Sequence, residues 1–186
     1  TAIASYLWDF DNDGYFDDAS GEAVSYVQTA DGVYTVRVKV TDRQGASAIA
    51  AAKVTVANVR PIADAGGPYT VPEGVDLRLD ARGTIDPGND IVSYLWDFDD
   101  DGQYDDATGA RPTFNRTAVG VYSIALKVID HRGAWSKDFA LVTVVNAPPT
   151  ADPGGPYEGY AGENIVLDAS GSYDLGDAIV AYEWDF

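Results

Sequence analysis

The stretch Ser93-Tyr-Leu-Trp-Asp-Phe-Asp-Asp-Asp-Gly102 is present twice almost unchanged and begins a third time. The earlier copy is Ser5-Tyr-Leu-Trp-Asp-Phe-Asp-Asn-Asp-Gly14, and the later one starts as Ala181-Tyr-Glu-Trp-Asp-Phe186. Trp8, Trp96 and Trp184 are therefore 88 residues apart, and no gap is needed to align the copies. Self-similarity at a fixed period is the signature of a repeat architecture.

The period divides the chain into three segments. Residues 1–58 are the C-terminal part of one repeat, 59–146 a complete repeat, and 147–186 the N-terminal part of a further repeat. We interpret the chain as a window cut from a longer array. The alternative is that the front part of one copy completes the back part of another. It is disfavoured because the tryptophan segment would then be present twice.

Composition limits the class of protein. A period of 88 residues suffices for a small domain with its own core. The net charge of −18 argues against a nucleic-acid partner and an anionic membrane surface. There is no cysteine to form disulfides, and no apolar run is long enough for a membrane span. We therefore expect no membrane insertion, and an acidic balance suits an extracellular setting.

Alternating patterns predict β-strands throughout. Val33–Thr41 alternates strictly, with Tyr34, Val36, Val38 and Val40 on one face, and its second copy repeats this with Tyr122, Ile124, Leu126 and Val128. Further strands are predicted at 53–57 and 141–145, and at 75–80 with Val75, Leu77 and Leu79 inward. In the tryptophan phrase, Tyr94, Trp96 and Phe98 share a face.

Gly, Asp, Asn and Pro clusters separate these strands, and no long segment has a helical period. Six or seven short strands per repeat predict an all-β fold of tandem immunoglobulin-like sandwiches. Trp96 is the expected core residue between the sheets. Tyr34 and Tyr122 resemble the tyrosine corner of such sandwiches. Short Pro-containing joints at 58–61 and 146–149 should be semi-rigid.

These phrases resemble the PKD (polycystic kidney disease) domain family over essentially the whole chain. The residues that carry the resemblance are Ala63–Tyr69, Leu79–Asp86, Tyr94–Phe98, Gly120–Asp130 and Gly133. The third copy has Leu167-Asp-Ala-Ser-Gly-Ser-Tyr-Asp174. The resemblance implies a non-catalytic spacer or interaction module of adhesins, secreted hydrolases and surface layers, with calcium in some members. The chain departs from the family's WDFGDG, because WDFDNDG and WDFDDDG stand here.

This departure places an acidic loop after each tryptophan strand. With the first Asp as position 1, acids stand at 1, 3, 5, 9 and 10, and glycine stands at 6. This is the spacing of an EF-hand-type calcium loop, whose position 7 contributes a backbone carbonyl. The predicted metal ligands are Asp9, Asp11, Asp13, Tyr15, Asp17 and Asp18 in one copy, and Asp97, Asp99, Asp101, Gln103, Asp105 and Asp106 in the other.

Calcium is the metal that these loops favour. It takes six to eight hard oxygens, whereas Mg²⁺ requires a tighter octahedron. The bidentate Glu of position 12 is missing, since Ser20 and Thr108 stand there. Asp18, Asp106 or water could take its place. The alternative is a solvated turn, because Asp and Gly form turns in any case.

The other candidate residues favour no enzyme. His131 is the only histidine, and Arg43 stands at its place in the first copy, which indicates a surface turn residue. Paired acids can serve a glycosidase, but here they crowd one loop that recurs in each copy. Tyr15, Phe16 and Tyr104 could stack on sugar rings, although packing is the commoner role.

The sequence therefore predicts a non-catalytic extracellular array, a stalk, spacer or filament of calcium-stabilised domains, secreted or on the surface of a prokaryotic cell. Its expected partners are neighbouring repeats and other copies of the chain. The alternative is an adhesion module that binds polysaccharide or a surface protein and accompanies a secreted enzyme or adhesin.

Overall fold

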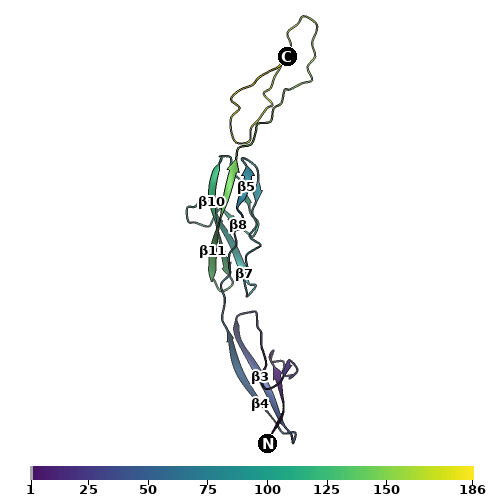
Figure 1. Cartoon of the computed structure of the whole chain (residues 1–186), viewed down its shortest axis with the longest axis vertical. Helices are drawn as coiled ribbons and strands as arrows, with labels where there is room; N and C mark the ends of the chain where they lie inside the picture. Colours follow the sequence, from purple (N-terminus) through teal and green to yellow (C-terminus); the bar gives the residue numbers. More distant parts are fainter. Residues whose placement is uncertain (1) are drawn as a thin grey trace. The chain divides into compact units, whose positions relative to one another are not determined.

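The computed structural model describes residues 2–186, which form strands, turns and irregular segments without a helix. Figure 1 traces the strands along the chain. Nothing in the described part is a helix long and apolar enough to cross a membrane. The chain forms two compact units. One comprises the chain up to Pro61 with Asp86–Ile91 and Asp130–Ala134, and the other contains the rest. The all-β prediction is confirmed.

The first unit contains one antiparallel sheet in the order β2-β1-β3-β4. Its strands are β1 (Ile3–Asp9), β2 (Ala19–Ser20), β3 (Gly32–Asp42) and β4 (Ser47–Val56). β3 confirms the alternating strand predicted over 33–41. β4 begins well before the predicted 53–57, because Ser47 pairs with Thr41 and the ladder runs the whole length of the hairpin. The small side chains at 50–52 hide this extension from the sequence pattern.

The second unit contains a five-stranded sheet in the order β5-β11-β10-β7-β8. It consists of β5 (Tyr69–Pro72), β7 (Ile91–Asp97), β8 (Ala107–Thr108), β10 (Gly120–Asp130) and β11 (Trp135–Val145). β5 runs parallel to β11, whereas β7–β8 and β10–β11 pair antiparallel. A separate two-stranded sheet pairs β6 (Leu77–Arg78) with β9 (Thr113–Phe114).

The core of the second unit lies around Trp96, which is fully buried, as predicted. Leu79, Phe114, Ile124 and Leu126 are buried with it. The indole Nε1 of Trp96 donates to the carbonyl of Gly109 at 2.9 Å, which satisfies the polar atom of an otherwise apolar side chain. Trp8 makes the same bond to Gly21 at 3.0 Å in the first unit.

Both tyrosine corners are present. The hydroxyl of Tyr34 donates to the carbonyl of Ala30 at 2.8 Å, and that of Tyr122 donates to Ala118 at the same distance. Each bond ties the start of a long strand to the chain four residues upstream. The resemblance seen in the sequence is thus confirmed in geometry.

The prediction of a strand over residues 75–80 is wrong in part. Only Leu77 and Arg78 pair in a ladder, and Val75 is exposed instead of inward. The reason is a turn at its start, where the N–H of Val75 donates to the carbonyl of Pro72 at 3.3 Å. Leu79 is buried as predicted, and its N–H donates to Pro112.

Residues 147–186 form no named strand, yet they keep local contacts of the preceding copy. The bridge Thr150–Tyr173 repeats the bridge Ile62–Ile85 at an offset of 88 residues. The hydroxyl of Tyr157 donates to Pro153, as that of Tyr69 donates to Ala65. Residues 179–185 correspond to β7, which pairs with β10, and this sequence holds no third copy of β10.

Glu73 is a fully buried acid in the second unit. Its Oε1 accepts the N–H of Ala147 at 3.1 Å, and its Oε2 has no partner among the described residues. The carboxylate lies directly against Gly176, where any Cβ would collide with it. This contact joins the end of β5 to a turn of the third copy.

Candidate metal centre

The two acidic loops start at the last residues of β1 and β7. Asp9 and Asp97 end these strands, and their exposed fractions are 0% and 1%. The backbone then turns sharply, with positive φ angles of 95° at Gly14 and 85° at Gly102. Glycine adopts this region without a steric penalty, which explains its place at position 6. The strand fixes the first acid, and the turn brings the following acids back towards it.

Three carboxylates converge in each loop. Asp9, Asp11 and Asp13 can each place an oxygen within 4.8 Å of the others, and Asp97, Asp99 and Asp101 do the same. Calcium–oxygen distances of about 2.3–2.6 Å put two ligands of one ion at most about 5.2 Å apart. The observed separations fit that limit. The structure therefore brings positions 1, 3 and 5 together in both copies.

Backbone N–H groups hold these carboxylates in place. Gly14 donates to Asp9 Oδ2 at 3.2 Å, and Gly102 donates to Asp97 Oδ2 at 2.9 Å. Position 5 binds the backbone of position 7 in the same way in both copies, at 2.7 Å. These bonds form within the loop, so the local sequence is enough to shape it.

One oxygen of the first loop has no protein partner. Asp9 Oδ1 is buried and accepts no hydrogen bond from the described residues. The matching Asp97 Oδ1 accepts the N–H of Asp100 at 2.7 Å. A buried carboxylate oxygen without a partner is costly. A cation bound among the three carboxylates would remove that cost, so the donor set fits calcium.

The other predicted ligands lie outside these trios. Asp18 and Asp106 fold back, and each accepts the N–H of the phenylalanine after the strand, at 2.5 Å. Asp17 and Asp105 are exposed. The Gln103 side chain donates to Asp101 Oδ2 at 2.8 Å. The carbonyl role of Tyr15 and Gln103, and the substitution for position 12, stay predictions.

The two loops differ within the turn, where Asn12 corresponds to Asp100, and also in the charge beside them. Arg37 Nη1 lies 3.8 Å from Asp9 Oδ2, and its guanidinium stands 5.8 Å from the ring centre of Phe16. Alanine occupies the corresponding place, residue 125, in the second copy. The first trio therefore has a protein cation beside it, whereas the second has none in the described structure.

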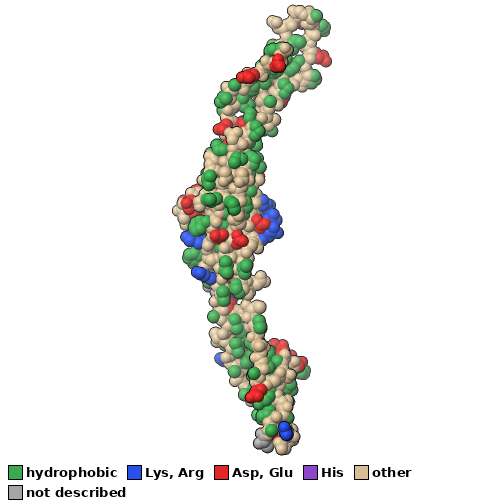
Figure 2. All heavy atoms as spheres, viewed as in Figure 1, with side chains coloured by type: hydrophobic (Ala, Val, Ile, Leu, Met, Phe, Trp, Pro, Cys, Tyr) green, Lys and Arg blue, Asp and Glu red, His purple; other side chains and the backbone are tan. Residues whose placement is uncertain are grey.

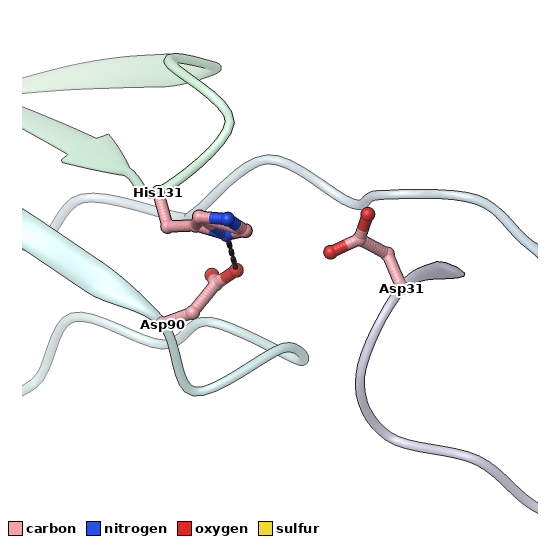
Figure 3. A group of neighbouring side chains, drawn as sticks. All are labelled: Asp31, Asp90 and His131. Atoms are coloured by element: carbon pink, nitrogen blue, oxygen red, sulfur yellow. Dashed lines mark hydrogen bonds and ion pairs between the residues drawn. The ribbon is translucent and has the colours of Figure 1, made fainter. Parts of the chain in front are cut away.

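A second group of ionisable side chains lies in the first unit, and Figure 3 shows it. His131 Nδ1 is 3.3 Å from Asp90 Oδ2, and Asp31 Oδ2 is 2.7 Å from Arg132 Nη2. A hydrogen bond with Asp86, together with burial and the charge of Asp86, raises the pKa of Asp90. His131 is half exposed in the β10–β11 turn.

The sequence did not predict this group, because its members differ from the residues at the same positions in the other copies. Asp90 corresponds to Ala2 and Ala178, and His131 corresponds to Arg43. These differences between the copies were the only signal in the sequence. They could not be assigned to one site, because the turns that carry these residues are far apart in the chain.

Comparison with known proteins gives relatives that are much longer than this chain. Collagenase ColA of Bacillus cereus is 33% identical over 91 residues, which cover 49% of the chain and 9% of the collagenase. The human dyslexia-associated protein KIAA0319 is 29% identical over 204 aligned residues, covering the whole chain and 19% of that protein. The chain thus spans less than a fifth of either relative.

The chain is also similar to a solved structure, and it matches one family model over most of its length. The PKD1 domain of Vibrio anguillarum Epp aligns with a TM-score of 0.40 and 25% identity, over 49% of this chain and all of that domain. The family model described as PKD domain matches residues 1–56 and 58–144, far more than half of the chain. The chain therefore belongs to the PKD domain family.

Proposed function

We propose that the chain is a non-catalytic, calcium-stabilised part of an extracellular array of PKD domains, which acts as a stalk, spacer or filament. The observation that carries this proposal is the pair of carboxylate trios, built alike at a distance of 88 residues. A site that is built alike in two successive copies serves the copies themselves, which is the pattern of a structural metal.

The chemistry of the trios supports calcium over magnesium. All donors are oxygens from short side chains gathered in one turn, which suits an ion with six to eight ligands. Magnesium would demand a strict octahedron at about 2.0–2.1 Å. Water would complete a calcium shell where position 12 offers no glutamate.

The affinity expected of such loops supports a location outside cells. Calcium loops of extracellular modules bind with a Kd on the order of 0.1–1 mM, so they fill only where calcium is abundant. A loop that lacks the bidentate ligand belongs in this weak class. The proposed partners are neighbouring repeats and other copies of the chain.

The test is a thermal melt of the full chain in calcium, in magnesium and in chelator. At a tenfold to hundredfold excess over Kd, calcium should stabilise the folded state by about 1.4–2.7 kcal/mol. For a domain of this size that raises Tm by several degrees. The triple variant Asp97→Asn, Asp99→Asn, Asp101→Asn should lose the rise in the second repeat.

Matched variants separate metal binding from a general charge effect. Glu158→Gln with Glu163→Gln removes exposed acids elsewhere and should keep the full rise. Asp99→Asn alone, at an exposed position, guards against misfolding of the triple variant. Equal shifts in calcium, magnesium and added sodium chloride would contradict the proposal and make the loops solvated turns.

A further inference from the structure

The outward face of each long hairpin is free of acids. In β3–β4 and β10–β11, twenty residues point away from the core, five on each strand. None of them is Asp or Glu, although the chain has 30 acidic residues. All four lysines of the chain lie on these faces, and they are Lys39, Lys53, Lys127 and Lys137. Figure 2 shows Lys and Arg in a few separate groups on the face in view.

The face of β10–β11 also carries large apolar side chains. Trp135, Phe139 and Leu141 alternate along β11 and are 49%, 51% and 53% exposed. Ser47, Ala51 and Lys53 stand at the corresponding places in β4. The fold therefore does not require these rings. Exposed apolar groups on an open sheet mark an interaction surface.

The two lysines of this face are directly opposed across the hairpin. Lys127 pairs with Lys137 in the ladder, and like charges at such a position repel. Neither lysine has an ion pair within the described chain. A bound anion would turn this repulsion into attraction.

Each lysine instead lies beside a ring. Lys127 Nζ is 5.0 Å from the ring centre of Trp135 and 5.7 Å from that of Tyr104. Lys137 Nζ is 5.1 Å from the ring centre of Phe139. Such cation–π contacts favour an arrangement in which an ammonium group lies beside each ring. The face thus offers apolar ring surfaces with a positive charge next to each.

We propose that the outward face of β10–β11 binds an acidic polysaccharide, whose sugar rings stack on Trp135 and Phe139 while its acidic groups bind Lys127 and Lys137. Along β11, Lys137 lies between Trp135 and Phe139, and Lys127 lies opposite it on β10, so both positive charges are close to both rings. An exposed row of rings suits a sugar better than an acidic peptide.

The test uses calorimetry of the full chain with a hexamer of 1,4-linked galacturonate. The neutral probe is a hexamer of 1,4-linked glucose, and an acidic peptide represents a protein partner. We expect the uronate to bind, and its affinity to fall with salt. Trp135→Ala and Phe139→Ala should each weaken binding about tenfold. Lys127→Gln with Lys137→Gln should weaken it further and remove the salt dependence.

The first hairpin supplies the matched control. Ile49 corresponds to Lys137 and is 52% exposed, so Ile49→Ala should leave binding unchanged. All variants change exposed side chains, and an unchanged Tm confirms their folding. No uronate binding, equal binding of the neutral hexamer, or tighter binding of the acidic peptide through the same residues would overturn the proposal.

Discussion

At the scale of single residues, the first acid of each loop is the informative one. Asp9 and Asp97 are buried at the ends of strands, whereas the other loop acids are exposed. Burial disfavours an unpaired charge. The strand thus holds a carboxylate where only hydrogen bonds and a cation can stabilise it, and the exposed acids of the turn complete the cluster.

Arg37 should weaken calcium binding in the first loop, since it brings a positive charge to Asp9. We expect Arg37→Ala to tighten calcium binding there severalfold, because like charges repel through a partly buried site. The reverse change, Ala125→Arg, should weaken the second loop. Calorimetric titration of Arg37→Ala, in a chain whose second loop carries the three Asp→Asn changes, measures the first effect.

A control is available at another arginine. Arg78 is exposed on β6 and has no ion pair with an acid of either loop among the described residues, so Arg78→Ala should not change the titration. An unchanged calcium affinity in Arg37→Ala would show that the arginine does not act on the site.

At the scale of elements, the turn between β10 and β11 depends on Asp130. Its Oδ1 accepts the N–H groups of Arg132 and Ala134, both at 2.9 Å, and its Oδ2 accepts Asn58 Nδ2 at 2.8 Å. Asp42 makes the equivalent backbone bonds between β3 and β4. Bonds from Asn58 and then from the backbone lower the pKa of Asp130, although burial opposes them.

This turn should make stability depend on acid. Because the folded pKa of Asp130 lies below its usual value of about 3.9, its ionised form stabilises the fold above that pH. The contribution is lost as pH falls through the folded pKa. Asp130→Asn should therefore lower Tm at pH 7, and the difference from the unchanged chain should shrink towards pH 2.

Asn58→Ala provides the companion measurement, because it removes the largest cause of the shift and leaves the carboxylate in place. Its Tm difference should shrink over the same pH range. A difference that is constant from pH 7 to pH 2 would mean that Asp130 does not act through its charge.

Most elements could be predicted because their side chains alternate. β3, β10 and the tryptophan strand β7 have that pattern. The spacing of the acids along each loop was enough to predict that their carboxylates converge. The pattern failed at Val75, where a turn overrides the alternation, and at the start of β4, where alanines carry no pattern. The group around Asp90 could not be predicted, since turns distant in sequence bring it together.

At the scale of the whole molecule, equivalent sequences have unequal pairing. β7 pairs with β10 and β8 within a five-stranded sheet, whereas residues 147–186 have one isolated bridge. Amide hydrogen exchange should therefore be slow in β7 and fast at 179–185, although the two segments repeat the same phrase. Mass spectrometry of exchanged peptides measures this. Equal protection of the two tryptophan phrases would contradict the dependence on pairing.

The contact of Glu73 with Gly176 has a genetic consequence. Gly88 stands at the position of Gly176 in the preceding copy, so both copies have a residue without a Cβ at this place. A recombination event that duplicates residues 59–146 would therefore leave a glycine for Glu73 to pack against. The gene can therefore gain whole repeats while the contact between Glu73 and a glycine is kept, so the number of repeats in such a chain can change from one generation to the next.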